Sequence, residues 1–301
     1  MSRLRVAART LVLVAALGAG CARAPLQPVH PTPRPTASPA PILLPMGGRT
    51  IFPRFRVVAF YGTPNVPAMG VLGDGSPDAA ARRLLKQSAA YASRRRPVAP
   101  AFEVIATVAQ ARSSDGNYNA PIDQADIARY LDGVRKIRGL LILDVQPGRA
   151  PFLAEVRRYE RFLREPDVEL ALDPEWSMGP NDVPGQKIGA TDAATVNAVS
   201  AYLAGLVARN RLPQKLLVLH QFTSDMIAHR NRIVPRPGLA IVFHIDGFGG
   251  RPAKRTKYDE LAQRDRRFYN GFKLFYEQDV DMFAASEVLG FRPVPDLITY
   301  E

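Results

Sequence analysis

The feature that most constrains the fold of this 301-residue chain is a repeated alternation of short, branched apolar runs with longer segments of helical periodicity. This alternation is the pattern of a parallel sheet whose strands are joined by crossover helices. The apolar runs cover residues 56–62, 102–110, 140–146, 168–175, 215–222, 239–246, 271–277 and 296–301. The sequence therefore predicts up to eight strands in one α/β domain.

The connections between these strands differ in length. Helices are predicted over residues 78–92, 123–137, 151–164 and 193–210, and the returns from helix to strand are brief, whereas the loops that leave the strands are long. Long loops at the carboxyl ends of strands are typical of a (β/α) barrel, which carries its active site there. We predict a TIM-type (β/α)8 barrel, distorted or lacking its last helix because the chain ends at the eighth strand; an open doubly wound sheet is the alternative.

The first 21 residues have the composition of a secretory signal. Arg3, Arg5 and Arg9 precede a short apolar run, and small residues lead to Cys21, the only cysteine. The run is too short for a spanning helix, and a single cysteine allows no intrachain disulfide. The sequence LGAGC at residues 17–21 resembles the lipobox of bacterial lipoproteins, with Gly18 where that family prefers Leu. The resemblance implies lipidation of Cys21 and anchoring on the outer face of the bacterial membrane; a cleaved signal without lipid is the alternative.

Residues 22–50 are predicted to form a disordered, proline-rich linker, since they contain eight prolines between residues 22 and 49 and no acidic residue. The barrel domain is then expected over residues 51–301. The net charge of +12 includes six arginines in residues 1–50, so the domain itself carries only +6. Export argues against a nucleic-acid partner, and the run Arg94-Arg95-Arg96 is interpreted as a solvated loop, with anionic wall polymers as the second interpretation.

Polar side chains are concentrated where the predicted strands end. They are Tyr61, Asp144, Gln146, Asp173, Glu175, His220, Gln221, His244, Asp246, Tyr276, Glu277, Tyr300 and Glu301. Residues two apart on a strand share a face, so Asp173 and Glu175 are expected to point together toward the mouth of the barrel. Each group alone has a structural explanation, such as a capping Asp or a core His. Together they predict a functional site, because burying such groups is unfavourable unless they are used or paired.

Paired carboxylates indicate glycoside hydrolysis, which needs one carboxylic acid and one carboxylate. Glu175 and Glu277 resemble, in position, the acid/base and the nucleophile of the retaining barrel glycosidases, although Pro174 replaces the usual Asn. A second glycosidase pattern would use Asp173 as nucleophile and Asp246 as acid, and both assignments stay open. We expect substrate contacts from Tyr61, Asp144, Gln146, Trp176, His220, Gln221, His244 and Tyr276.

The segments LILDVQPG, LALDPEW, KLLVLHQF and FHIDG resemble an uncharacterised family of actinobacterial secreted proteins and lipoproteins. The resemblance implies export and a glycoside hydrolase-like barrel, and it brings no established activity. We predict a cell-surface lipoprotein that acts on or binds a polysaccharide, without cofactor, metal or nucleic acid. The alternatives are a non-catalytic carbohydrate- or wall-binding barrel and a metal-dependent hydrolase that uses His220, His244 and a carboxylate of the eighth strand, although the first strand lacks the His-x-His of such enzymes.

Overall fold

The computed structural model describes Leu13 and residues 40–301. Cys21, the predicted signal sequence apart from Leu13, and the linker up to residue 39 lie outside the described residues. The unit Pro41–Glu301 forms one compact body. In the described part of the chain, no helix combines the length and hydrophobicity that crossing a membrane requires.

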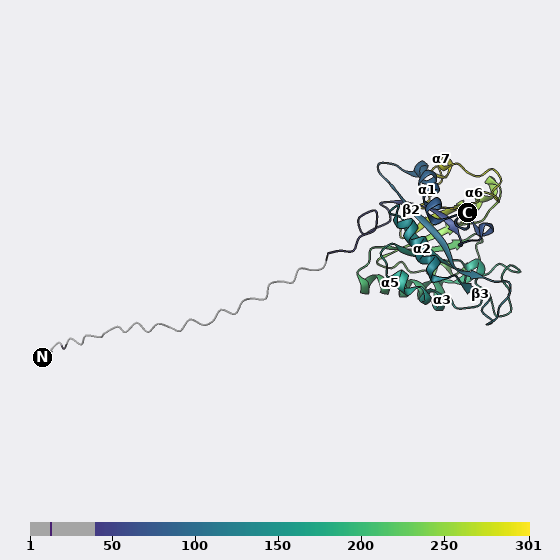
Figure 1. The fold of residues 1–301 in the computed structure, drawn as a ribbon, viewed down its shortest axis with the longest axis horizontal. Coiled ribbons are helices and arrows are strands. Elements are labelled where there is room, and N and C mark those ends of the chain that lie inside the picture. Colours follow the sequence, from purple (N-terminus) through teal and green to yellow (C-terminus); the bar gives the residue numbers. More distant parts are fainter. Residues whose placement is uncertain (1–12, 14–39) are drawn as a thin grey trace, which may run out of the picture. The chain divides into compact units, whose positions relative to one another are not determined.

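Eight parallel strands form a closed barrel (Figure 1). In chain order they are β1 (Arg56–Gly62), β2 (Val98–Ala109), β4 (Leu140–Val145), β5 (Val168–Leu172), β7 (Lys215–Gln221), β9 (Leu239–Ile245), β10 (Tyr269–Leu274) and β11 (Leu297–Tyr300). Each strand pairs with the next, and β1 closes the ring because it pairs with both β2 and β11. The predicted (β/α)8 barrel is confirmed, and closure excludes the open sheet.

Helices cover the outside of the barrel. They are α1 (Pro77–Ser88), α2 (Gln124–Arg135), α3 (Phe152–Arg158), α4 (Glu160–Leu163), α5 (Ala193–Asn210), α6 (Arg251–Leu261) and α7 (Ala285–Val288). Three begin at side-chain caps, in which Ser76, Asp123 and Asp192 accept hydrogen bonds from backbone N–H groups of the first turn. The helical ring is interrupted between β7 and β9, where the connection holds a short strand, β8 (Ile227–Ala228), and a 3-10 turn, Arg230–Arg232.

Side chains alternate between the outside and the inside of each barrel strand. Outward residues such as Leu141, Leu170 and Phe243 pack in the apolar layer under the helices. Inward residues near the amino ends of the strands, such as Val57 and Ile142, form a second apolar cluster inside the barrel. Toward the carboxyl ends the inward residues become polar, so the long strand-to-helix loops surround a polar mouth.

Residues 41–55 close the other end of the barrel. Leu44, Ile51 and Phe52 are buried in the inner apolar cluster. The Gln214 Oε1 atom accepts hydrogen bonds from the backbone N–H groups of Ile51 and Phe52, at 2.8 and 3.0 Å. Residues 41–50 are predicted to belong to the disordered linker, but in the structure they are ordered, because Leu44 is buried in the inner apolar cluster and Met46 packs against it. The compact unit therefore starts at Pro41.

Candidate active site

The upper half of the barrel interior contains polar residues from all eight strands. Following the inward positions upward, these are Tyr61, Glu103, Asp144, Gln146, Asp173, His220, His244, Asp246, Lys273, Thr299 and Glu301. On each strand the first of these residues lies two positions after an inward apolar or small residue, and Gln146, Asp246 and Glu301 lie two positions farther along the same face. This shared alternation is why one strand geometry brings them together. Most are buried, and their charges therefore interact strongly.

A cavity of about 430 Å³ opens at the mouth above these residues. Its polar lining consists of Tyr61, Gln146, Asp173, Glu175, Asp246, Lys257, Lys273, Gln278 and Glu301, and its apolar walls include Trp176, Phe222, Phe248 and Phe275. Glu175 belongs to a 3-10 turn, Pro174–Trp176, that begins directly after β5. The predicted residues Asp173, Glu175 and Asp246 thus meet in one cavity, as do Tyr61, Gln146 and Trp176.

Below the cavity, His220 lies between two carboxylates. Its Nδ1 atom is 2.7 Å from Oδ2 of Asp246, and its Nε2 atom is 2.9 Å from Oε1 of Glu103. Burial lowers the pKa of His220, but the hydrogen bonds and charges of Asp246 and Glu103 outweigh burial and raise it well above the ordinary value. We infer that His220 is an imidazolium that donates to both acids. The Thr299 hydroxyl donates a further hydrogen bond to Glu103, at 3.1 Å.

Asp246 is held ionised by this arrangement. Burial raises its pKa, but the hydrogen bond and charge of His220 and the charge of Lys273 outweigh burial, so the pKa lies below the ordinary value. The second carboxylate oxygen, Oδ1, has no hydrogen-bond partner. Asp246 also lines the cavity, with this oxygen buried at its floor.

The carboxyl groups at the ends of β4 and β5 have pKa values that are shifted in the opposite direction. Burial, followed by the negative charge of Asp246, raises the pKa of Glu175 to about 7. Burial and the charge of Asp144 raise the pKa of Asp173 well above its ordinary value, and burial raises that of Asp144 to about 6. The Tyr61 hydroxyl donates to Asp144 at 2.8 Å. One cavity thus holds protonated and ionised carboxyl groups at neutral pH.

Lys273 adds a fixed positive charge to the floor of the cavity. Its Nζ atom is 2.7 Å from Oε2 of Glu301 and 3.4 Å from the centre of the Tyr61 ring. Burial lowers the pKa of Lys273, but the charges of Glu301, Asp246 and Glu103 outweigh burial and raise it above the ordinary value. Lys273 is therefore an ammonium group that can bind an oxygen atom and is not a candidate base.

A metal ion was one expectation for the histidines. Among the described residues, Asp173, His220 and Asp246 place one ligand atom each within 4.8 Å of one another. However, both nitrogens of His220 are hydrogen-bonded to carboxylates, and an imidazolium has no lone pair to give to a metal. Asp173, His220 and Asp246 therefore do not fit a metal site unless His220 gives up its hydrogen bonds to Glu103 and Asp246.

The structure places three predicted substrate contacts away from the cavity. His220 and His244 are fully buried, and neither they nor Gln221 line it. The ring of His244 occupies the space beside Gly271, where a Cβ atom would lie 2.1 Å from Nδ1, and burial keeps its pKa well below the ordinary value. His220 and His244 lie beneath the floor of the site, whereas Gln221 lies on the opposite face of β7 and donates to the Thr223 carbonyl at 3.0 Å. The structure therefore gives these three residues structural positions and does not place them against a bound substrate. Asp144 is also fully buried and acts through Tyr61.

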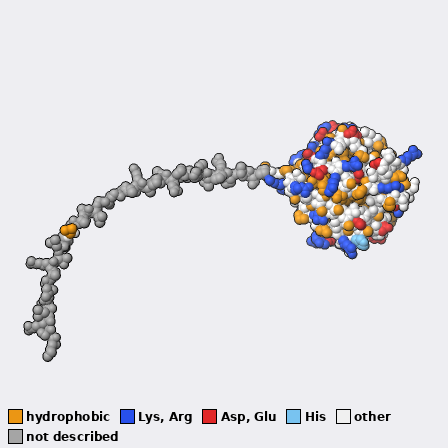
Figure 2. Space-filling model, turned by 90° about the horizontal axis from the view of Figure 1, so that it is seen from below, with side chains coloured by type: hydrophobic (Ala, Val, Ile, Leu, Met, Phe, Trp, Pro, Cys, Tyr) orange, Lys and Arg blue, Asp and Glu red, His pale blue; other side chains and the backbone are white. Residues whose placement is uncertain are grey.

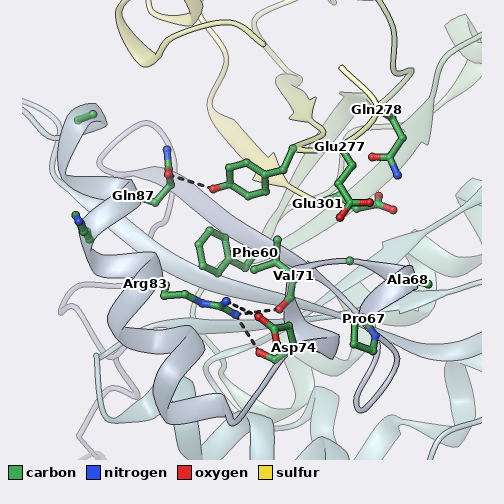
Figure 3. A pocket seen from close by; sticks show the side chains of 14 residues that line it. Phe60, Pro67, Ala68, Val71, Asp74, Arg83, Gln87, Glu277, Gln278 and Glu301 are labelled. Atoms are coloured by element: carbon green, nitrogen blue, oxygen red, sulfur yellow. Dashed lines mark hydrogen bonds and ion pairs between the residues drawn. The ribbon is translucent and has the colours of Figure 1, made fainter. Parts of the chain in front are cut away.

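Glu277 does not reach the cavity that holds Glu175. The predicted strand 271–277 ends at Leu274, and Glu277 lies exposed in the following turn. It lines an adjoining cavity of about 700 Å³, together with Tyr276 and Glu301. Figure 3 shows Glu277 and Glu301 on one side of this space, with Arg83 bonded to Asp74 on the other. The two cavities share Ala68, Gln278 and Glu301, so they are continuous at the mouth.

Two central residues of the site, Glu103 and Lys273, are not among the sequence-based candidates. The signal was present in both cases: each is a charged residue inside an apolar strand, and each is two residues from a small inward residue, Ala101 and Gly271 respectively. The sequence-based candidates all come from the ends of predicted strands, whereas Glu103 lies in the middle of β2. A charge at an inward position of any strand is the more general signal.

Comparison with known proteins identifies similar folds. No protein-family model matches the chain, and no curated protein matches it. A GH5 family lichenase from Caldicellulosiruptor sp. F32 aligns over 76% of this chain and 75% of its own, with 11% identity and a TM-score of 0.41. A GH18 chitinase from Flavobacterium johnsoniae aligns over 82% of this chain and 87% of its own, with 9% identity and a TM-score of 0.39. Both neighbours are glycoside hydrolases, and the similarity concerns the fold alone.

Proposed function

We propose that this protein is a glycoside hydrolase in which Glu175 is the general acid and Asp246 is the ionised carboxylate. One observation carries the proposal: both groups line one cavity at the mouth of the barrel, and their surroundings shift their pKa values in opposite directions. Carboxyl groups separated in this way provide the acid and the carboxylate that sugar hydrolysis needs.

The proposed reaction follows from these protonation states. Glu175 gives its proton to the glycosidic oxygen as the bond to the sugar carbon breaks, which avoids an alkoxide leaving group. The Asp246 carboxylate stabilises the positive charge that develops on the sugar, either by bonding to it or by activating the water that attacks it. Lys273 and the protonated Asp173 can donate hydrogen bonds to sugar hydroxyls. The result of one cycle is two shorter sugars from one glycan and one water.

The charge of the mouth supports a neutral or cationic glycan as the substrate. The loops at the carboxyl ends of the strands, residues 63–76, 110–123, 146–151, 173–192, 222–232, 246–250 and 275–284, together with residue 301, contain 13 Asp and Glu but five Lys and Arg. Such a surface repels anionic polymers. The adjoining cavity offers room for further sugar units, and there the exposed ring of Tyr276 provides a flat face, stacked on Tyr300 at 5.3 Å.

We also propose that the protein is exported and anchored by lipid on Cys21 at the outer face of a bacterial membrane. The basic, apolar and small residues of the first 21 positions support this proposal. Mass spectrometry of the protein purified from membranes tests it. We expect an N-terminal peptide that starts at a diacylated Cys21; an unmodified peptide that begins elsewhere would contradict the proposal.

Polysaccharide digestion tests the proposed reaction. Neutral, cationic and anionic polysaccharides are incubated with the wild type, Asp246→Asn and the exposed control Asp132→Asn, and released reducing ends are measured with and without a chelator. We expect the wild type and the control to cleave a neutral or cationic polymer in either condition, and Asp246→Asn to be inactive while still folded. A polymer that is retained but not cleaved would indicate a binding barrel, and activity lost with the chelator would indicate a metal-dependent hydrolase.

A further inference from the structure

The end of the barrel opposite the mouth carries a concentrated positive charge. We define the base as the segments that enter the amino ends of the eight strands: residues 41–55, 92–97, 136–139, 164–167, 211–214, 233–238, 262–268 and 289–296. The base contains 14 Lys and Arg and four Asp and Glu, a net charge of +10. Residues 41–301 as a whole carry 35 basic and 28 acidic residues, or +7. The positive excess of the domain therefore lies at the base.

The basic residues of the base face solvent. Twelve of the 14 are exposed: Arg49, Arg54, Arg94, Arg95, Lys136, Arg138, Arg164, Arg211, Arg264, Arg266, Arg267 and Arg292. Thirteen of the 14 are arginine, whose planar guanidinium binds phosphate through paired hydrogen bonds. The surface thus combines high charge density with the side chain best suited to phosphate groups.

The acidic residues of the base are already paired. Glu165 and Asp167 bind Arg135 at 2.8 and 2.7 Å, and Asp265 binds Arg267 at 2.6 Å. Asp296 binds Arg96. Within the described residues, no acidic side chain of the base is left to neutralise the other arginines.

Arg54, Arg94, Arg95, Arg264 and Arg266 form no ion pair with any described residue. Cations near the carboxyl end of a helix stabilise the helix, which accounts for some of the basic residues in the base. This effect is confined to the last turn of the helix. Arg54 precedes the first strand, Arg94 and Arg95 follow a short 3-10 turn, and Arg264 and Arg266 lie beyond the end of α6. The helix dipole therefore does not account for these five.

The chain also enters the barrel through the base. Leu44 and Ile51 fill the inner end of the barrel, and Arg49 donates to the carbonyl of Leu212 at 2.8 Å. The 40 preceding residues, which contain five arginines and no acid, are joined to the unit here. Figure 2 shows Lys and Arg side chains close to the first described residues of this unit.

We infer that the base is a docking surface for an anionic phospholipid membrane. Each Lys or Arg near such a surface adds attraction, and salt weakens it. The base is positive and the mouth, at the opposite end of the barrel, is negative. Docking through the base therefore turns the mouth away from the membrane, toward the solution from which a glycan would enter it. The inference goes beyond glycan hydrolysis and does not depend on it.

Vesicle binding tests the docking surface in the full chain with Cys21→Ser, which removes any lipid. The wild-type surface is compared with Arg94→Ser/Arg95→Ser/Arg264→Ser/Arg266→Ser. The matched control, Arg82→Ser/Arg112→Ser/Arg157→Ser/Arg161→Ser, removes the same charge from exposed sites outside the base. Partition into phosphatidylcholine vesicles with and without phosphatidylglycerol is measured by sedimentation at low and high salt. All three proteins keep the same N-terminal sequence, so only the removed charges differ.

We expect binding that requires phosphatidylglycerol, that salt weakens, and that the base variant loses by at least about tenfold while the control retains it. Equal binding to uncharged vesicles, or equal loss in both variants, would overturn the inference. Binding to a soluble anionic wall polymer with none to vesicles would also overturn it. If the base variant does not fold, Arg54→Ser/Arg95→Ser is used in its place.

Discussion

At the scale of single residues, the site depends on the imidazolium of His220. It places one positive charge between Glu103 and Asp246, which would otherwise be two buried carboxylates facing each other. Removing one partner of a buried ion pair leaves uncompensated charge and is strongly destabilising. His220 is thus a positioning residue that keeps Asp246 ionised and oriented.

The His220→Asn variant should lose about 3–5 kcal/mol of unfolding free energy at neutral pH. The raised pKa of His220 stabilises the folded state fully below the unfolded value near 6.5, and this contribution disappears as the pH rises through the folded pKa. Urea unfolding at several pH values measures both effects. The exposed His229→Asn serves as the control, and equal stability of the two variants would contradict the role of His220.

The pH dependence of hydrolysis should report Glu175. A general acid must be protonated, so we expect kcat/KM to fall as the pH rises through about 7, the pKa of Glu175. At the acid end, activity should persist below the ordinary pKa of an aspartate, since the pKa of Asp246 is lowered. Initial rates across pH check this expectation. If the residual activity of Glu175→Gln falls at the same alkaline pH as that of the wild type, the alkaline decrease in kcat/KM belongs to another group.

Much of this residue arrangement could be predicted from sequence, because it follows from strand alternation. Asp173, Glu175 and Asp246 meet as predicted from their places at strand ends. The position of Glu277 could not be predicted, because the end of β10 depends on the turn at residues 276–278. The burial of His220 depends on its contact across the barrel with Glu103, and that of His244 on the space beside Gly271 of the neighbouring strand, and no local pattern contains either contact.

At the scale of elements, the strands and their order could be predicted from the sequence. The plug, which is the segment of residues 41–55 that closes the base of the barrel, could not. The predicted strand at residues 56–62 and the predicted helix at residues 193–210 coincide with β1 and α5. Residues 41–50 have a linker composition, rich in proline and glycine, and only the barrel gives Leu44 and Met46 a place to pack. Tertiary packing therefore overrides composition there.

The plug should contribute to stability through its buried side chains. Ile51 is fully buried in the inner cluster, and Ile51→Ala should lower the free energy of unfolding by about 2–5 kcal/mol. Ile42, of the same residue type and 39% exposed, provides the control, for which we expect a change within about 0.5 kcal/mol. Equal small effects in a denaturant titration would show that the plug is dispensable.

At the scale of the whole molecule, the two ends of the barrel have opposite charge. The mouth holds the carboxyl groups and an acidic rim, and the base holds the plug and the exposed arginines. The overall charge of +12 does not reveal this separation of charge, because composition does not say which loops lie at the same end of the barrel. The fold assigns each loop to one end and thereby separates the charges.

Cleavage of a neutral oligosaccharide of defined length tests the central claim most directly. Its rate is measured with the wild type, Glu175→Gln and the exposed control Glu260→Gln, after equal thermal stability has been verified. We predict that Glu175→Gln lowers the rate by about 10²–10⁴-fold, since a general acid contributes that much, and that Glu260→Gln matches the wild type. Equal rates for Glu175→Gln and the wild type would contradict the assignment of Glu175 as the acid.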